Sequence, residues 1–215
     1  ILEFGPGELR LLDNNESEVF FLHEKYEPMD NVIVYLGSIR DRDKLDSLCR
    51  GVDIVFHVAA FKHVYLCEYN PFDAVMTNVI GTQNLLKSAT ASGVERVLFT
   101  SSDKAVNPTN VMGSTKLLAE RMVTAYNVTP GRERAVFASS RFGNVIGSRG
   151  SVVPVFYKQI KRGGPVTVTD PQMTRFIMTI PEAARLVIEA CTLAKGGEVF
   201  ISKMPVIRIV DLAAV

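Results

Sequence analysis

The sequence predicts an α/β fold, in which a doubly wound parallel sheet carries helices on both faces and a small lobe follows at the C-terminal end. Short apolar segments alternate with segments of helical periodicity as far as Arg141, which is typical of parallel strands joined by helices. Small, polar and charged residues follow several of these strands, as expected at the ligand-binding edge of such a sheet. The alternation ends soon afterwards, so we divide the chain into residues 1–145 and 146–215.

Apolar runs and helix-capping signals define the elements of the first part. The expected strands are Leu9–Asp13, Val32–Leu36, Asp53–Ala59 (a buried strand), Arg96–Ser101 and Ala135–Arg141. The expected helices are Glu16–Tyr26, Asp41–Cys49, Asp73–Ser92 and Thr115–Tyr126. A doubly wound nucleotide fold begins with a strand and a Gly-rich turn, and we expect both to be absent from this chain. Gly5-Pro6-Gly7 is no substitute, because it precedes a strand instead of opening a helix.

In the second part of the chain, strands and helices alternate less regularly. Its expected elements are a helix at Val153–Lys161, a strand at Val166–Thr169, a helix from Pro181 to Ala194, a strand at Val199–Ser202 and a helix at Val210–Val215. Pro181 follows Thr179, and proline is well placed at the first position of a helix.

Composition narrows the class of protein. The 215 residues are 47% hydrophobic with a net charge of +1, which favours a globular domain and gives no basic excess for nucleic acid. No apolar run approaches the roughly 20 residues that span a bilayer. The chain has three cysteines and three histidines, and none has metal-ligand spacing. We therefore expect buried thiols in a reducing, cytoplasmic compartment and no metal.

The segment after the strand Arg96–Ser101 concentrates the groups that proton transfer needs. Ser102 could bind a substrate hydroxyl, Asp103 could act as a general acid, and Lys104 could act as a general base. The alternative for Asp103 and Lys104 is a surface salt bridge. Lys116, on the following helix, is a candidate ligand for a cofactor ribose and would lower the pKa of nearby hydroxyls.

Three other places could serve a cofactor. Asp13 ends a strand, where a carboxylate can accept both ribose hydroxyls and would favour NAD over NADP; the alternative is that it caps the next helix. Ala59 and Ala60 would let a cofactor approach closely. Asn78 is a weak helix former within a long helix, so we expect it to support a neighbouring strand or the Lys116 region.

Cations and amides elsewhere could bind a charged substrate. Lys62 and His63 follow the third strand, and an exposed loop with incidental charge is the alternative. Asn144, Arg149 and Arg175 lie in the loops of the second part, where arginine suits bidentate binding of a diphosphate. A lone loop arginine is otherwise simply solvated.

These blocks resemble the extended short-chain dehydrogenase/reductases, and within them the UDP-N-acetylglucosamine 4,6-dehydratases of polysaccharide biosynthesis. The similar region runs from about Asp13 to Leu212. Its specific blocks are Ala-Ala-Phe-Lys-His-Val (59–64), Glu-Tyr-Asn-Pro (68–71), Ser-Ser-Asp-Lys-Ala-Val-Asn-Pro-Thr-Asn (101–110), Arg-Phe-Gly-Asn-Val-Ile-Gly-Ser-Arg-Gly-Ser-Val-Val-Pro (141–154) and Asp-Pro-Gln-Met-Thr-Arg-Phe-Ile-Met-Thr (170–179).

The resemblance implies a Rossmann-like fold, bound NAD, a UDP-sugar substrate and a set of site residues. Hydride would leave sugar C4, Lys104 would remove the C5 proton, Asp103 would protonate the departing 6-hydroxyl, and hydride would return to C6. Lys62, Lys116 and Arg141 would join the cofactor-binding residues. The superfamily also leads us to expect a homo-oligomer, formed through the helices Asp73–Ser92 and Thr115–Tyr126.

The chain departs from the family pattern at three places. The Gly-rich phosphate loop is missing, Ser38 stands where the family has aspartate, and Met112 stands where the catalytic tyrosine is usual. We include Met112 in the catalytic set because another base must then take the C4 hydroxyl proton, and a water held by Ser102 or Asp103 is our hypothesis. Methionine here resembles a membrane-anchored subgroup that retains configuration at C5, which implies a cytoplasmic domain of a larger inner-membrane protein.

Two other functions stay open. A UDP-sugar 4-epimerase or other NAD-dependent oxidoreductase would need no group to expel the 6-hydroxyl, so Asp103 and Lys104 argue against it. A non-catalytic NAD-sensing protein would leave the same pair without a purpose.

Overall fold

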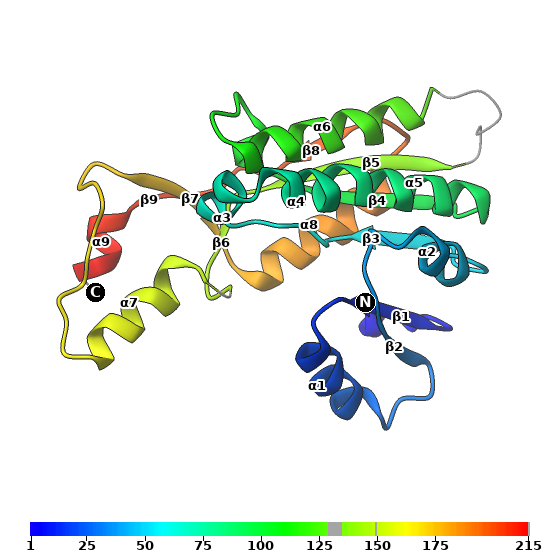
Figure 1. Ribbon diagram of the computed structural model, residues 1–215, viewed down its shortest axis with the longest axis horizontal. Coiled ribbons are helices and arrows are strands. Elements are labelled where there is room, and N and C mark those ends of the chain that lie inside the picture. Colours follow the sequence, from blue (N-terminus) through cyan, green and yellow to red (C-terminus); the bar gives the residue numbers. More distant parts are fainter. Residues whose placement is uncertain (129–134, 149, 215) are drawn as a thin grey trace.

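The computed structural model describes residues 1–128, 135–148 and 150–214, which form helices packed on parallel sheets (Figure 1). The strands are β1 (Leu9–Asp13), β2 (Val32–Leu36), β3 (Ile54–His57), β4 (Arg96–Ser102), β5 (Val136–Phe142), β6 (Asn144–Val145), β7 (Thr174–Met178), β8 (Val199–Ile201) and β9 (Val206–Arg208). The α-helices are α1 (Glu16–Tyr26), α2 (Arg42–Leu48), α3 (Val64–Tyr69), α4 (Pro71–Val75), α5 (Thr82–Ala91), α6 (Val111–Tyr126), α7 (Val152–Lys161), α8 (Ile180–Leu193) and α9 (Ile209–Ala214). Short helical turns are η1 (Leu2–Phe4) and η3 (Asp103–Ala105), and η2 (Met76–Gly81) is a π-helix.

The strands form three sheets. A four-stranded parallel sheet has the order β3-β4-β5-β8, and β1 and β2 form a separate parallel pair. In the third sheet β7 pairs parallel with β6 and antiparallel with β9. The predicted α/β class with helices on both faces is confirmed (Figure 1). The parallel pairs are divided among three sheets, and no strand of the described residues joins β1 to β3.

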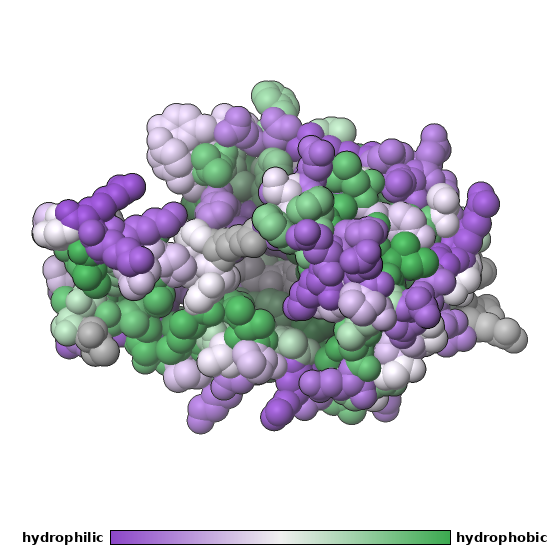
Figure 2. Space-filling view, turned by 90° about the horizontal axis from the view of Figure 1, so that it is seen from below, coloured by the Kyte–Doolittle hydropathy of each residue, from purple (hydrophilic) through white to green (hydrophobic). Residues whose placement is uncertain are grey.

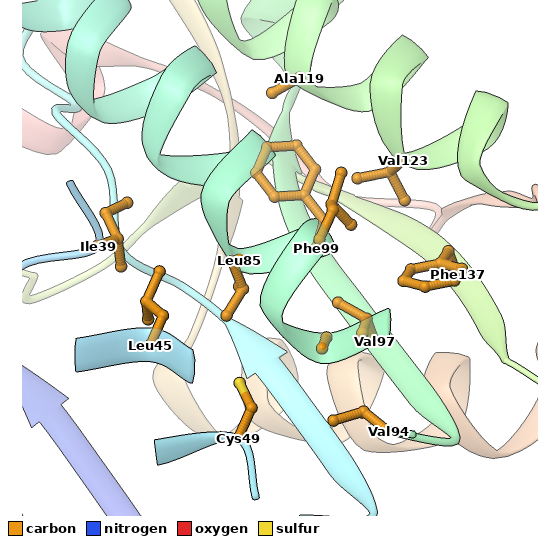
Figure 3. Close-up of a cluster of buried hydrophobic side chains, with 12 residues drawn as sticks. Ile39, Leu45, Cys49, Leu85, Val94, Val97, Phe99, Ala119, Val123 and Phe137 are labelled. Carbon is orange, nitrogen blue, oxygen red and sulfur yellow. The ribbon is translucent and has the colours of Figure 1, made fainter. Parts of the chain in front are cut away.

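Two apolar layers hold the helices to the four-stranded sheet. One contains Leu85 of α5, Phe99 of β4, Val123 of α6 and Phe137 of β5, all at most 5% exposed (Figure 3). The other lies on the opposite face, against α8 (Figure 1). Burial of each large side chain contributes about 1.5–3 kcal/mol. These layers fix the carboxyl ends of β4 and β5 in space, and the candidate site lies at those ends.

Several predicted elements differ from the observed ones for local reasons. The strand predicted at Val166–Thr169 does not form, because the side chain of Gln159 accepts from the backbone N–H of Thr167. The third strand is shorter than predicted and only partly buried, since Ile54 and Val58 are exposed. The helix predicted at Asp73–Ser92 begins at Pro71 and is interrupted by the π-helix η2.

The C-terminal lobe contains α7, β7, β9 and α9 and lies at one end of the molecule (Figure 1). Viewed from below, this end carries a broad area of apolar side chains (Figure 2). Exposed apolar residues of the lobe include Val155, Ile160, Phe176 and Val206.

Candidate active site

The turn that follows β4 holds three side chains in one hydrogen-bonded group. Ser102 Oγ donates to Asp103 Oδ1 over 3.0 Å, and Lys104 Nζ donates to the same oxygen over 2.9 Å. Ser102 Oγ also accepts from the backbone N–H of Lys104. Both charged side chains are mostly buried, so the pair differs from the exposed salt bridge that was the alternative interpretation. One acid and one base are thus held side by side at the sheet edge.

Asn144, the first residue of β6, joins this group just beyond the end of β5. Its Oδ1 accepts from Lys104 Nζ over 3.2 Å, so the ammonium is held between the end of β4 and the start of β6. The sequence predicted a substrate contact for Asn144, and the structure adds this contact with the lysine. The backbone between β5 and β6 is tightly packed, because a Cβ on Gly143 would lie 2.8 Å from Met204 Sδ and 2.9 Å from the Phe176 oxygen.

Lys116 lies on the buried face of α6, which packs against β4. Its Nζ donates to the carbonyl of Thr100 over 2.8 Å and lies 4.6 Å from the centre of the Phe99 ring. Burial lowers the pKa of Lys116 to about 8. An ammonium that loses its proton near neutral pH can exchange protons with a neighbouring group more easily than an ordinary lysine can.

A buried histidine lies on the other side of Phe99. His57 Nε2 is 2.8 Å from Thr82 Oγ1, which itself donates to the carbonyl of Asn78. Because the hydroxyl hydrogen is used in this way, Nε2 must carry the hydrogen that it donates to Thr82. Burial and the charge of Lys116 lower the pKa of His57 to about 3, so the imidazole is neutral at physiological pH.

Asn78, in the π-helix η2, joins the loop after β3 to α6 through its side-chain amide. Its Oδ1 accepts from the N–H of Phe61, and its Nδ2 donates to the carbonyl of Phe61 and to Thr115 Oγ1. The side chain is fully occupied by protein partners, which agrees with a supporting role rather than direct contact with a cofactor. It fixes the segment with Ala59 and Ala60 after β3 and ties that segment to α6.

Met112 does not contribute a reactive group to the site. Its side chain is 3% exposed and packs in an apolar cluster with Cys67 of α3 and Ala74 of α4. A thioether enclosed by apolar groups packs α6 against α3 and α4, and this position offers no group for proton transfer.

Arg141 also has a role that differs from its predicted one. Its Nε and Nη2 donate to the two carboxylate oxygens of Glu120 over 2.9 and 2.7 Å, and Glu120 is 1% exposed. A guanidinium engaged in this bidentate pair has its strongest donors occupied. The structure thus adds an ion pair between β5 and α6, while the cofactor contact of Arg141 stays a prediction.

Asp13, Lys62 and His63 lie at the surface, and Arg175 is partly exposed. Asp13 ends β1 and accepts from the N–H of Asn15, while Asn15 itself caps α1. Lys62 and His63 are exposed, and the His63 ring packs against Gly150, where an added Cβ would meet it at 2.5 Å. Arg175 donates to the carbonyl of Thr174. Arg149 lies outside the described residues.

A cavity of about 470 Å³ opens beside Asp103. It is lined by Asp103, Val106, Arg141, Phe176, Ile201, Ser202, Lys203 and Met204. The walls come from the ends of β4, β5 and β8 and from β7 of the lobe, so the acid of the candidate site faces a space of the size of a small ligand.

Sequence reasoning missed Arg40 and Glu120. Arg40 donates to Thr77 Oγ1, to Asp73 Oδ1 and to the Asp73 carbonyl, and its guanidinium lies 5.6 Å from the centre of the Phe61 ring. Glu120 had a readable signal, since a glutamate four residues after Lys116 lies on the same helix face. Neither partner of Arg40 is close to it in sequence, so the chain gives no local signal for that cluster.

In the part of the chain that the structure describes, no helix is long and apolar enough to cross a membrane. No group of three or more histidine, cysteine or acidic side chains there is arranged to hold a metal ion.

Comparison with known proteins relates the chain to one family, whose members include a dehydratase and an epimerase of nucleotide sugars. A family model described as polysaccharide biosynthesis protein matches residues 1–215. An uncharacterized membrane protein of Methanocaldococcus jannaschii is 54% identical over 215 residues, covering 100% of this chain and 64% of that protein. A UDP-N-acetylglucosamine 4,6-dehydratase (inverting) of Campylobacter jejuni is 41% identical over 212 residues, covering 98% and 63%. A UDP-glucose 4-epimerase of Rickettsia bellii is 42% identical over 179 residues, covering 83% and 52%.

Among solved structures, Pen from Bacillus thuringiensis superposes with a TM-score of 0.96 at 49% identity. The superposition covers 99% of this chain and 66% of that one. The chain therefore spans less than two thirds of the length of these proteins.

Proposed function

Because the chain belongs to the polysaccharide biosynthesis protein family of extended short-chain dehydrogenase/reductases, we propose that it carries the active site of an NAD-dependent nucleotide-sugar 4,6-dehydratase. The substrate we propose is UDP-N-acetylglucosamine and the product is a UDP-4-keto-6-deoxy sugar, with configuration retained at C5. The observation that carries the proposal is the Ser102–Asp103–Lys104 group, which places a candidate acid and a candidate base 2.9 Å apart beside a cavity. Elimination of water needs such a pair.

The donor set fits a dinucleotide at the ends of β1 and β3. Asp13 ends β1 with a partly free carboxylate, which suits ribose hydroxyls and disfavours a 2′-phosphate. Ala59 and Ala60 offer little bulk beyond β3, and Lys116 is the candidate for the second ribose. Residues 1–145 would hold the cofactor and residues 146–215 would contribute to the sugar nucleotide site. Bound NAD+ supplies a reversible hydride acceptor.

The chain's own residues would then carry the elimination. Oxidation at C4 gives a ketone that acidifies the proton on C5. Transfer of a proton from the Lys104 ammonium to the Asp103 carboxylate, along their hydrogen bond, gives the neutral amine and the carboxylic acid that the elimination needs. Lys104 then removes the C5 proton, and Asp103 protonates the departing 6-hydroxyl. Ser102 orients Asp103 through its hydrogen bond, and Asn144 orients Lys104. A water held by Ser102 or Asp103 is our candidate base for the C4 hydroxyl, since Met112 offers none.

Substrate contacts complete the proposal. Lys62 and His63 lie on the loop after β3, and the His63 ring touches the segment that leads into α7. Arg149 and Arg175 are the candidates for the diphosphate. The prediction of a homo-oligomer in the cytoplasm, anchored through a segment outside this chain, stays a prediction; one relative is described as a membrane protein.

Mass spectrometry of the reaction mixture tests the proposed reaction. We expect the full-length protein, incubated with UDP-N-acetylglucosamine and NAD+, to form a product lighter by the mass of one water. Asp103→Asn should reduce this product by about a hundredfold or more, whereas Asp30→Asn, at an exposed position, should not change it. A product of unchanged mass with altered chromatographic retention would favour the epimerase, and a UDP-glucose 4-epimerase is one of the relatives, at 42% identity. Bound NAD without any product would favour the non-catalytic sensor.

A further inference from the structure

The buried face of α6 carries two charged side chains one helical turn apart. Lys116 and Glu120 are 6% and 1% exposed, and each is bound to the strand pair beneath the helix. Lys116 Nζ donates to the Thr100 carbonyl of β4. The Glu120 carboxylate accepts hydrogen bonds from Nε and Nη2 of Arg141 on β5, as a bidentate pair. The helix is therefore held on the sheet at two polar points, one on each strand.

The Glu120–Arg141 pair lies close to the candidate catalytic group along both β4 and β5. Arg141 pairs in register with Ser101, whose next neighbours along the chain are Ser102 and Asp103. Asn144 follows Arg141 by three residues and holds Lys104. Arg141 also lines the cavity that Asp103 faces. Movement of the Arg141 side of β5 would therefore shift both partners of the acid–base pair.

Burying a charged pair carries a desolvation cost, so stability alone does not explain why Glu120 and Arg141 occupy this space. Apolar residues of similar volume often serve a buried position equally well, whereas removal of one partner leaves an uncompensated charge. The bidentate fork, however, sets both distance and orientation between a helix and a strand. An apolar contact would permit small sliding movements that the fork prevents.

We propose that Glu120 and Arg141 are positioning residues, which set the register between α6 and the ends of β4 and β5 and so align Lys104 with Asp103 and Asn144. This inference rests on the proposed function for its catalytic consequence, but its geometric part does not need turnover. The fork keeps Asn144 at the right place to hold the Lys104 ammonium. Without it the acid and base would remain in the protein but would lose their alignment.

The test replaces the ion pair by an apolar pair, Glu120→Leu with Arg141→Met, in the full-length protein. Two properties are measured: the side-chain amide signals of Asn144 in nitrogen-15 NMR spectra, and the separate kcat and KM of the dehydration. We expect a similar melting temperature, altered Asn144 amide signals, and a kcat lower by roughly a hundredfold with little change in KM. Arg141→Lys, which keeps the charge but not the fork, should fall between the parent and the apolar pair.

Each outcome decides the proposal. Unchanged Asn144 signals would overturn it, and so would altered signals with an unchanged kcat. If the apolar pair does not fold, Arg141→Lys carries the test: an unaltered Asn144 signal and kcat there overturn the proposal. A parent protein that forms no dehydrated product contradicts the proposed function instead, and the Asn144 signals alone then decide whether the pair positions Lys104.

Discussion

His57 is a residue whose protonation state follows from its surroundings. It lies in β3 between the apolar layer and the π-helix, and its Nε2 hydrogen is donated to Thr82. A neutral imidazole fits this place, and an imidazolium would be a buried charge beside Lys116. The residue therefore links the stability of the fold to pH.

The pH dependence of unfolding should reveal this histidine. The pKa of His57 is lowered from 6.5 to about 3 in the folded protein, so below pH 6.5 the unfolded chain binds a proton that the folded protein does not. Stability should fall as the pH is lowered through this window, by about 2–3 kcal/mol between pH 6.5 and 4.5. We expect urea unfolding of His57→Gln to depend less on pH, while His23→Asn, at an exposed position, should follow the parent. Equal pH dependence of His57→Gln and the parent would contradict the assignment.

Gly113 is the residue at which α6 touches the catalytic turn most closely. A Cβ there would lie 2.3 Å from the backbone oxygen of Lys104, which cannot rotate away. We expect Gly113→Ala to be destabilised by about 1–3 kcal/mol in urea unfolding, despite the better helix propensity of alanine. Gly7→Ala is the matched control, because nothing lies within 4 Å of that position. A Gly113→Ala protein as stable as the parent would show that the turn and α6 can separate without cost.

At the scale of elements, the helix that runs from Pro71 to Ala91 joins the two sides of the site. Its π-helical stretch places Thr77 on Arg40 and the next residue, Asn78, on Phe61 and Thr115. π-helical turns are rare and often occur at functional sites. Periodicity predicted a long helix here correctly, but the π turn depends on partners from distant parts of the chain and has no local signal.

Hydrogen exchange should show what Asn78 does for the loop after β3. Asn78→Ala removes the acceptor for the Phe61 N–H and the donor for its carbonyl, so we expect the Phe61 amide to exchange faster and stability to fall by about 2–4 kcal/mol. Asn84→Ala removes only the bonds of one amide nitrogen, to the carbonyls of Ile39 and Arg40, and serves as the control with a smaller effect. Unaltered exchange at Phe61 would mean that the loop is held by other contacts.

Other elements show where sequence reasoning succeeds and fails. The strands Leu9–Asp13 and Val32–Leu36 and the helix Glu16–Tyr26 form at their predicted bounds, because strong apolar runs and an asparagine cap define them locally. Ser102 ends β4, one residue beyond the predicted strand, and Asp103 and Lys104 follow it in η3. For Arg141 a cofactor contact was predicted, and for Met112 a place in the catalytic set. The partners that the structure gives these two residues come from elements far away in the chain, so the sequence held no local signal for them.

At the scale of the whole molecule, α5 and α6 cover one face of the four-stranded sheet and α8 the other (Figure 1). Exposed apolar side chains occur on both sides. Leu118 of α6 is 51% exposed and Leu193 of α8 is 67% exposed. The predicted homo-oligomer would use the α6 side.

Sedimentation of the full-length protein tests this expectation. If the homo-oligomer forms through α6, Leu118→Arg should shift it toward the monomer, because a buried guanidinium without a partner opposes association. Leu193→Arg, on the opposite face, should leave the assembly intact. A parent protein that sediments as a monomer, or equal effects of both substitutions, would contradict the predicted interface.

The most direct test of the central claim is proton NMR of the full-length protein with UDP-N-acetylglucosamine and NAD+ in deuterated water. The proposed roles of Asp103 and Lys104 predict a new C6 methyl signal and deuterium at C5, with ring couplings that report retained configuration. A sugar epimerised at C4, without a methyl group and without deuterium at C5, would contradict the elimination that we assign to this pair.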